Sequence, residues 1–130
     1  MRLEQALAIV RFVVDEAPGA VSVFVADTHG EVVAAATMDG AAPDTRLNAR
    51  RKAYTARMFR TTTLEFQKRT ATDPTLAAQR DVADILALGG GVPIQVGNET
   101  IGAVGSSGSS QEMDDACAKA GIAKVKDLLK

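Results

Sequence analysis

Most of the chain's 11 glycines fall between residues 89 and 108, and this concentration constrains the fold more than any other feature. Two short apolar runs, residues 92–96 and 100–104, flank the turn-forming triplet Gly97-Asn98-Glu99. Apolar runs separated by such a turn are typical of a β-hairpin. The sequence therefore predicts a hairpin that has glycine-rich segments at both ends.

A glycine–serine segment, residues 105–110, joins this hairpin to a helix expected from about Gln111. A loop that enters a helix presents unpaired N–H groups and the positive end of the helix dipole, which suit a carboxylate, a phosphate or a haem propionate. The alternative is that the glycines only permit tight turns and close packing, which is the commoner use of glycine. On the first interpretation, the ligand-binding residues are Gly90, Gly91, Val92, Pro93, Gly105, Ser106, Ser107 and Gly108.

Composition narrows the class of protein. Residues 1–130 are long enough for one domain with a proper core, and 46% hydrophobic and 24% charged residues are ordinary globular values. A net charge of −1 argues against nucleic acid as a partner.

No apolar run is long enough for a membrane helix and the first residues lack a signal-peptide core, so we expect a cytoplasmic protein without a membrane partner. The single cysteine, Cys117, excludes an intrachain disulfide and multi-cysteine zinc sites, so we predict no metal site.

Periodicity along the chain predicts an α+β fold. Apolar spacing of three and four residues marks the helices, and short β-rich runs bounded by turn residues mark the strands. Five strands between two helical layers make a profilin-like three-layer α/β/α sandwich with a mostly antiparallel sheet. The first predicted helix carries its apolar stripe from Leu3 to Val14 and is ended by Pro18-Gly19. The other predicted helices cover residues 45–60, 64–69, 74–80 and 111–129, and the predicted strands cover residues 21–26, 31–37, 85–88, 92–96 and 100–104.

Lys52 occupies an unusual position in the predicted helix 45–60. Its helical neighbours include Ala49, Ala53 and Ala56, which form an apolar face of small residues. A lysine there either extends along the packed face to reach water or points into a pocket. If the amine is desolvated, its pKa falls and it can act as an acid, a base or a carboxylate anchor.

Several motifs, in the same order along nearly the whole chain, resemble the GlcG/HbpS-like family. The matching blocks are VADTHGEVVA at 25–34, MDGA at 38–41, KAYTA at 52–56, GGGVPI at 89–94, IGAVG at 101–105 and DDACAKAG at 114–121. This family is also described as haem-binding or haem-degrading and is similar to the C-terminal domain of PduO. The resemblance implies a profilin-like fold and a homo-oligomer, from dimer to octamer. It also implies either haem binding or a role beside catabolic enzymes that act on small organic acids.

The first functional hypothesis is an enzyme or binding protein for an organic acid in a catabolic pathway. Lys52 and the glycine-rich loops would hold the ligand's carboxylate or a developing enolate. Asp39 or Glu112 would move a proton, which suits an isomerase, a tautomerase or a hydrolase. This hypothesis requires no cofactor, and its partner is a small-molecule carboxylate.

The second hypothesis is a haem or tetrapyrrole binder. His29 is the one histidine, and besides the four methionines it is the conventional axial ligand for haem iron. A third hypothesis is an accessory oligomer without chemistry of its own, because the helices 45–60 and 111–129 each carry a second apolar face. On the sequence alone, the organic-acid hypothesis ranks first, haem binding close behind and the accessory oligomer third.

Overall fold

The sheet is formed by two hairpins, as the turn residues predict. In the computed structural model, which describes residues 1–129, β1 (Ser22–Ala26) pairs with β2 (Val32–Thr37), and β3 (Gly91–Val96) pairs with β4 (Glu99–Ser107). The first and last strands of these hairpins, β1 and β4, also pair, with Val25 opposite Val104. The strand order is β2-β1-β4-β3 and every neighbouring pair is antiparallel.

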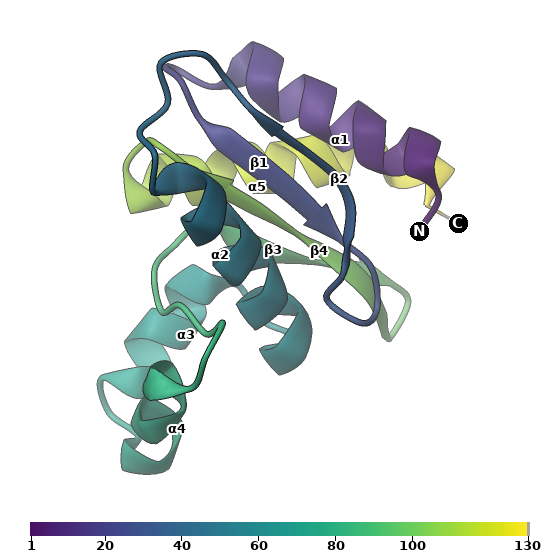
Figure 1. Ribbon diagram of the computed structural model, residues 1–130. Helices are drawn as coiled ribbons and strands as arrows, with labels where there is room; N and C mark the ends of the chain where they lie inside the picture. Colours follow the sequence, from purple (N-terminus) through teal and green to yellow (C-terminus); the bar gives the residue numbers. More distant parts are fainter. Residues whose placement is uncertain (130) are drawn as a thin grey trace.

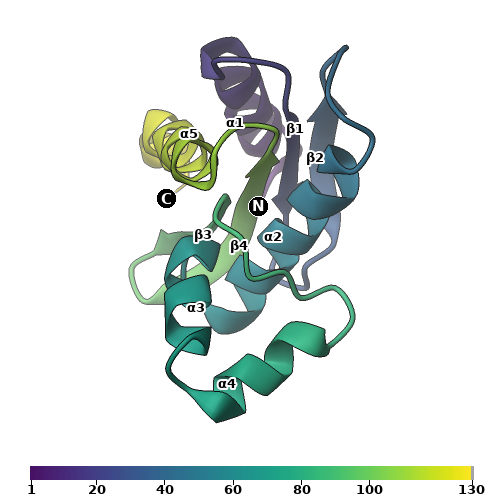
Figure 2. The ribbon, with the colours of Figure 1, turned by 90° about the vertical axis from the view of Figure 1, so that its left-hand side faces the viewer.

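Helices cover both faces of this sheet (Figure 1). On one face, α1 (Leu3–Glu16) packs on β1 and β2, and α5 (Gln111–Lys124) packs on β3 and β4 and against α1. On the other face, α2 (Thr45–Phe59) crosses β1, β4 and β3. Figure 2 shows the resulting three layers, with α3 (Thr63–Thr70) and α4 (Pro74–Ala78) extending away from the sheet. Short 3₁₀ turns at Gln79–Asp81 and Lys126–Leu128 follow α4 and α5.

The predicted α+β sandwich is therefore correct in its layers, but the sheet has four strands and not five. Residues 85–88, which we predicted to be a strand, form an irregular segment against α2. The Leu86 N–H donates to Thr55 Oγ1 at 2.9 Å, and the preceding Asp84 pairs with Arg50 at 2.7 Å. These contacts with α2 replace strand pairing, so the short apolar run packs against a helix.

The two sides of the sheet have different cores. Between the sheet and α1 and α5, the core is built from large aliphatic side chains such as Ile9, Val13 and Ile94. Between the sheet and α2, it is built from alanines, including Ala53 and Ala103. A Cβ atom on Gly105 of β4 would collide with the Ala49 carbonyl, so glycine is what allows α2 to lie this close to the strand.

The two ends of the described chain lie side by side (Figure 1). Gln5, near the start of α1, donates a hydrogen bond from Nε2 to the Leu128 carbonyl. Within residues 1–129, no helix has the length and apolar character required to span a bilayer.

Candidate functional site

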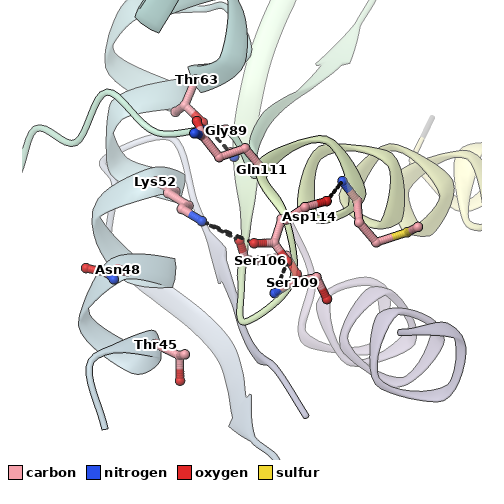
Figure 3. A network of polar contacts seen from close by, with 12 residues as sticks. Thr45, Asn48, Lys52, Thr63, Gly89, Ser106, Ser109, Gln111 and Asp114 are labelled. Atoms are coloured by element: carbon pink, nitrogen blue, oxygen red, sulfur yellow. Dashed lines mark hydrogen bonds and ion pairs between the residues drawn. The ribbon is translucent and has the colours of Figure 1, made fainter. Parts of the chain in front are cut away.

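Lys52 lies at the centre of a closed polar cluster and does not extend to water. The side chain projects from α2 toward the sheet and the start of α5 (Figure 3), and the residue is only 3% exposed. Its Nζ donates to the Ser106 carbonyl at 3.0 Å and lies 3.4 Å from Asp114 Oδ2. Of the two arrangements that the sequence left open, extension of the Lys52 amine to water does not occur, and the amine is enclosed by protein groups.

Asp114 is the anionic partner, and the start of α5 positions it. Ser110 caps the helix by accepting a hydrogen bond from the Met113 N–H at 3.1 Å, which sets the first turn. Asp114 then points back, and its Oδ1 accepts from the Ser109 N–H at 3.1 Å. Both carboxylate oxygens therefore have partners inside the protein.

The glycine triplet packs beside Lys52, and Gly90 lies against its amine. Gly90 has φ +132°, a backbone conformation that disfavours any side chain, and a Cβ atom there would lie 2.9 Å from Lys52 Nζ. The flanking glycines are held by side chains. The Gly91 N–H donates to Thr63 Oγ1 at 2.8 Å. The Gly89 N–H donates to Gln111 Oε1, also at 2.8 Å (Figure 3). The packing interpretation of these glycines is therefore the one that the structure supports.

The predicted ligand-binding loop at residues 105–107 is instead the end of β4. Gly105 lies opposite Gly91 and Phe24 in the sheet, and Ser107 lies opposite Ser22. The Ser106 N–H donates to the Gly90 carbonyl at 2.9 Å. Gly105 thus pairs with both neighbouring strands, Ser106 and Ser107 pair with β1, and the Ser106 N–H is already bonded to Gly90, so this segment is not the open loop of unpaired N–H groups predicted for anion binding.

Burial affects both charged groups of the cluster. Desolvation lowers the pKa of Lys52, although the nearby Asp114 carboxylate partly opposes this effect. Desolvation likewise raises the pKa of Asp114, and Lys52 and the Ser109 N–H oppose the shift. The pair is thus held by geometry and hydrogen bonds against a substantial cost of removing both charges from water.

The other predicted catalytic residues are not part of this cluster. Asp39, in the loop after β2, and Glu112, in the first turn of α5, are exposed. Within residues 1–129, neither forms a hydrogen bond or ion pair with Lys52, and the four main cavities are lined by other residues. The geometry therefore gives no support to a catalytic set of Lys52, Asp39 and Glu112. No group of three or more histidine, cysteine, aspartate or glutamate side chains in this range is placed to hold a metal ion.

Sequence reasoning missed the role of Asp114. Asp114 stands in the first turn of α5, where negative charge is favourable in any helix, so its position gives no sign of a partner. The partner of Lys52 is 62 positions away, and helical or strand spacing carries no signal for such a pair. A weak signal was available, since a buried lysine requires a buried anion nearby.

A second group of functional side chains surrounds His29. An open cavity of about 290 Å³ lies between the β1–β2 turn and the last turns of α2. Its lining includes an imidazole, a phenol, a thioether and a guanidinium group. The lining residues are Thr28, His29, Gly30, Tyr54, Arg57 and Met58.

The turn that carries His29 is well fixed. Asp27 Oδ1 accepts hydrogen bonds from the N–H groups of His29 at 2.8 Å and Glu31 at 3.1 Å. Gly30 has φ +77°, and a Cβ atom there would come within 2.7 Å of the Tyr54 ring, so the turn packs directly on α2. Arg57 adds a hydrogen bond from Nε to the Thr28 carbonyl at 2.6 Å. The exposed His29 side chain therefore stands on a rigid base.

Two of the predicted ligand-binding residues line a different cavity. Val92 and Pro93 of β3 face a space of about 410 Å³ between the sheet edge and α5. The glycine-rich segment thus contributes to two separate environments, the closed cluster around Lys52 and this apolar cavity.

Comparisons with known proteins identify related sequences and structures. A family model described as "Haem degrading protein HbpS-like" matches residues 1–123. A solved double mutant of Streptomyces reticuli HbpS is 34% identical, with a TM-score of 0.89 over 96% of this chain and 86% of that one. No match was found among curated proteins.

Two further solved structures share the fold at lower identity. The Klebsiella pneumoniae protein ORFY is 26% identical, with a TM-score of 0.87 over 95% of this chain and 88% of that one. A structure described as a PduOC:heme complex is also 26% identical, with a TM-score of 0.86 over 95% and 93% of the two chains.

Proposed function

The chain belongs to the HbpS-like family, and from this membership and the His29 cavity we propose that it binds haem. One observation carries the proposal: His29, Tyr54 and Met58 line the same cavity beside Arg57. Imidazole, phenolate and thioether groups are the side chains that hold haem iron in many proteins. The PduOC structure, which was solved with haem, supports the same ligand class.

The residues around the cavity have the chemistry that haem requires. His29 would be the axial ligand, because its side chain is exposed at the cavity and its backbone is fixed by Asp27. The Arg57 guanidinium uses Nε for the Thr28 carbonyl, and within residues 1–129 its terminal nitrogens make no hydrogen bond, so they suit a propionate. Bound haem would supply a redox-active iron, while the protein supplies the ligand, the cation and the apolar contacts.

The organic-acid hypothesis, which we ranked first from the sequence, receives less support. Its central residue, Lys52, is committed to Asp114 and Ser106 inside the protein, and a small carboxylate would have to displace both. The haem hypothesis uses residues that are already accessible. A homo-oligomer and a cytoplasmic location stay predictions of the sequence.

A haemin titration of the purified protein tests the proposal. We expect saturable binding with a shifted Soret band, and His29→Ala should reduce affinity at least about tenfold, since it removes the iron ligand. Arg57→Met should weaken binding less, and Arg11→Met on α1 is its matched control. If haemin does not bind saturably, the function is wrong. If it binds equally well to His29→Ala, the function stands but this site is wrong.

Tyr54→Phe separates the two strongest iron ligands in the cavity. A His29 ligand predicts an unchanged Soret maximum in Tyr54→Phe and a shifted one in His29→Ala. The opposite pattern would assign the iron to the Tyr54 oxygen.

A further inference from the structure

The cavity between β3 and α5 has the properties of a second ligand site. It encloses about 410 Å³, within the range of small-molecule pockets. Helix α5 packs on β3, and residues of the sheet edge and of the helix line the cavity on its two sides. Most of the lining is aliphatic, and the residues that form these walls are Val92, Pro93, Val96, Ile122, Ala123 and Leu129.

Two lysines form the charged part of the lining. Lys119 and Lys126 are seven positions apart, two helical turns, so they follow the same side of α5 and its 3₁₀ extension, with Ile122 and Ala123 between them. Lys119 is neutralised by Asp115 at 2.8 Å. Lys126 forms no ion pair with any residue in the range 1–129. The cavity therefore combines an apolar interior with one cation, Lys126, that has no anionic partner in the part of the chain that the structure describes.

From this combination we propose that the cavity binds an apolar monocarboxylate, with its chain between β3 and α5 and its carboxylate at Lys126. The apolar walls stabilise the chain by removing it from water. Lys126 supplies a charge-assisted hydrogen bond to the head group.

This site is independent of the proposed haem function. The cavity lining contains no histidine, tyrosine, methionine or cysteine, so it offers none of the side chains proposed above to hold haem iron. It also differs from the carboxylate site first predicted around Lys52, because that amine is enclosed whereas Lys126 is exposed. Of the residues first predicted to bind a carboxylate, Val92 and Pro93 are the two that line it.

Calorimetric titration with octanoate, and with octan-1-ol as its uncharged counterpart, tests the proposal on the full chain. We expect octanoate to bind at least about fivefold more tightly than octan-1-ol, because only the anion pairs with Lys126. Lys126→Met should weaken octanoate about fivefold to tenfold and leave octan-1-ol unchanged. Lys124→Met, which removes an exposed lysine outside the cavity, is the matched control and should leave both affinities unchanged.

A second variant tests the apolar walls. Ala123→Phe places a ring at the cavity and should reduce binding of both probes, while His29→Ala should change neither. The proposal is overturned if octanoate does not bind, if octan-1-ol binds equally well, or if Lys126→Met and Lys124→Met have equal effects.

Discussion

Helix α2 contributes a charged side chain to two sites, the closed cluster around Lys52 and the open cavity beside His29. Lys52 faces the sheet and is enclosed by Gly90, Ser106 and Asp114. Tyr54 lies only two positions later, about 200° around the helix, and with Arg57 it lines the open His29 cavity. One helix thus supplies a buried cation, Lys52, that pairs inside the protein and a partly exposed cation, Arg57, at an open cavity. The difference in burial separates the two roles.

The largest expected effect comes from breaking the enclosed pair. Lys52→Met leaves Asp114 buried without its cation, so we expect the free energy of unfolding to fall by about 3–5 kcal/mol. Urea denaturation measures this loss. The double variant Lys52→Met/Asp114→Asn removes both charges and should recover most of it. A loss below about 1 kcal/mol in the single variant would mean that the pair behaves like a surface ion pair.

The next effect concerns the glycine that encloses Lys52. Gly90→Ala combines an unfavourable backbone conformation with a collision against the Ser106 carbonyl, and we expect a loss of about 2–4 kcal/mol. Gly97→Ala is the matched control, because Gly97 also has positive φ (+61°) but has open space around its Cβ position. It should cost about 1–2 kcal/mol. Equal losses would show that packing around Lys52 adds nothing.

The pH dependence of Lys52→Met provides a smaller but more specific test. Burial raises the pKa of Asp114, and removal of Lys52 raises it further. A carboxyl group whose pKa is higher in the folded than in the unfolded state stabilises the protein at low pH, and this contribution disappears as pH rises through the folded pKa. The difference in stability between wild type and variant should therefore shrink as pH falls toward the ordinary value of 3.8. The expected change is about 1.4 kcal/mol for each unit by which the variant raises the pKa.

The smallest effect on stability is expected for His29→Ala, at the open cavity. His29 is exposed and its turn is held through backbone N–H groups, so His29→Ala should change the free energy of unfolding by less than about 0.5 kcal/mol. The same variant is expected to have the largest effect on haemin binding. A large loss of stability in His29→Ala would remove the distinction between the two sites.

Local patterns were sufficient to predict most of the elements. The hairpins at residues 22–37 and 91–107 follow from turn residues between β-rich runs, and α1 ends before Pro18 as its position predicts. The predicted strand at residues 85–88 was wrong, because a four-residue apolar run does not distinguish a strand from a segment that packs on a helix. That segment contacts α2 through Thr55, which lies 31 positions earlier.

The sequence by itself determined the α+β class, both hairpins and the unusual position of Lys52 on a face of small residues. Only the tertiary structure decided that Lys52 is enclosed, because its enclosure requires Asp114 and Gly90, and neither lies near it along the chain. The same holds for residues 105–107, which lie at the end of β4, paired with β1, and not in an open loop. Local spacing specifies which element a residue joins, whereas burial and pairing depend on elements that meet only when the chain folds.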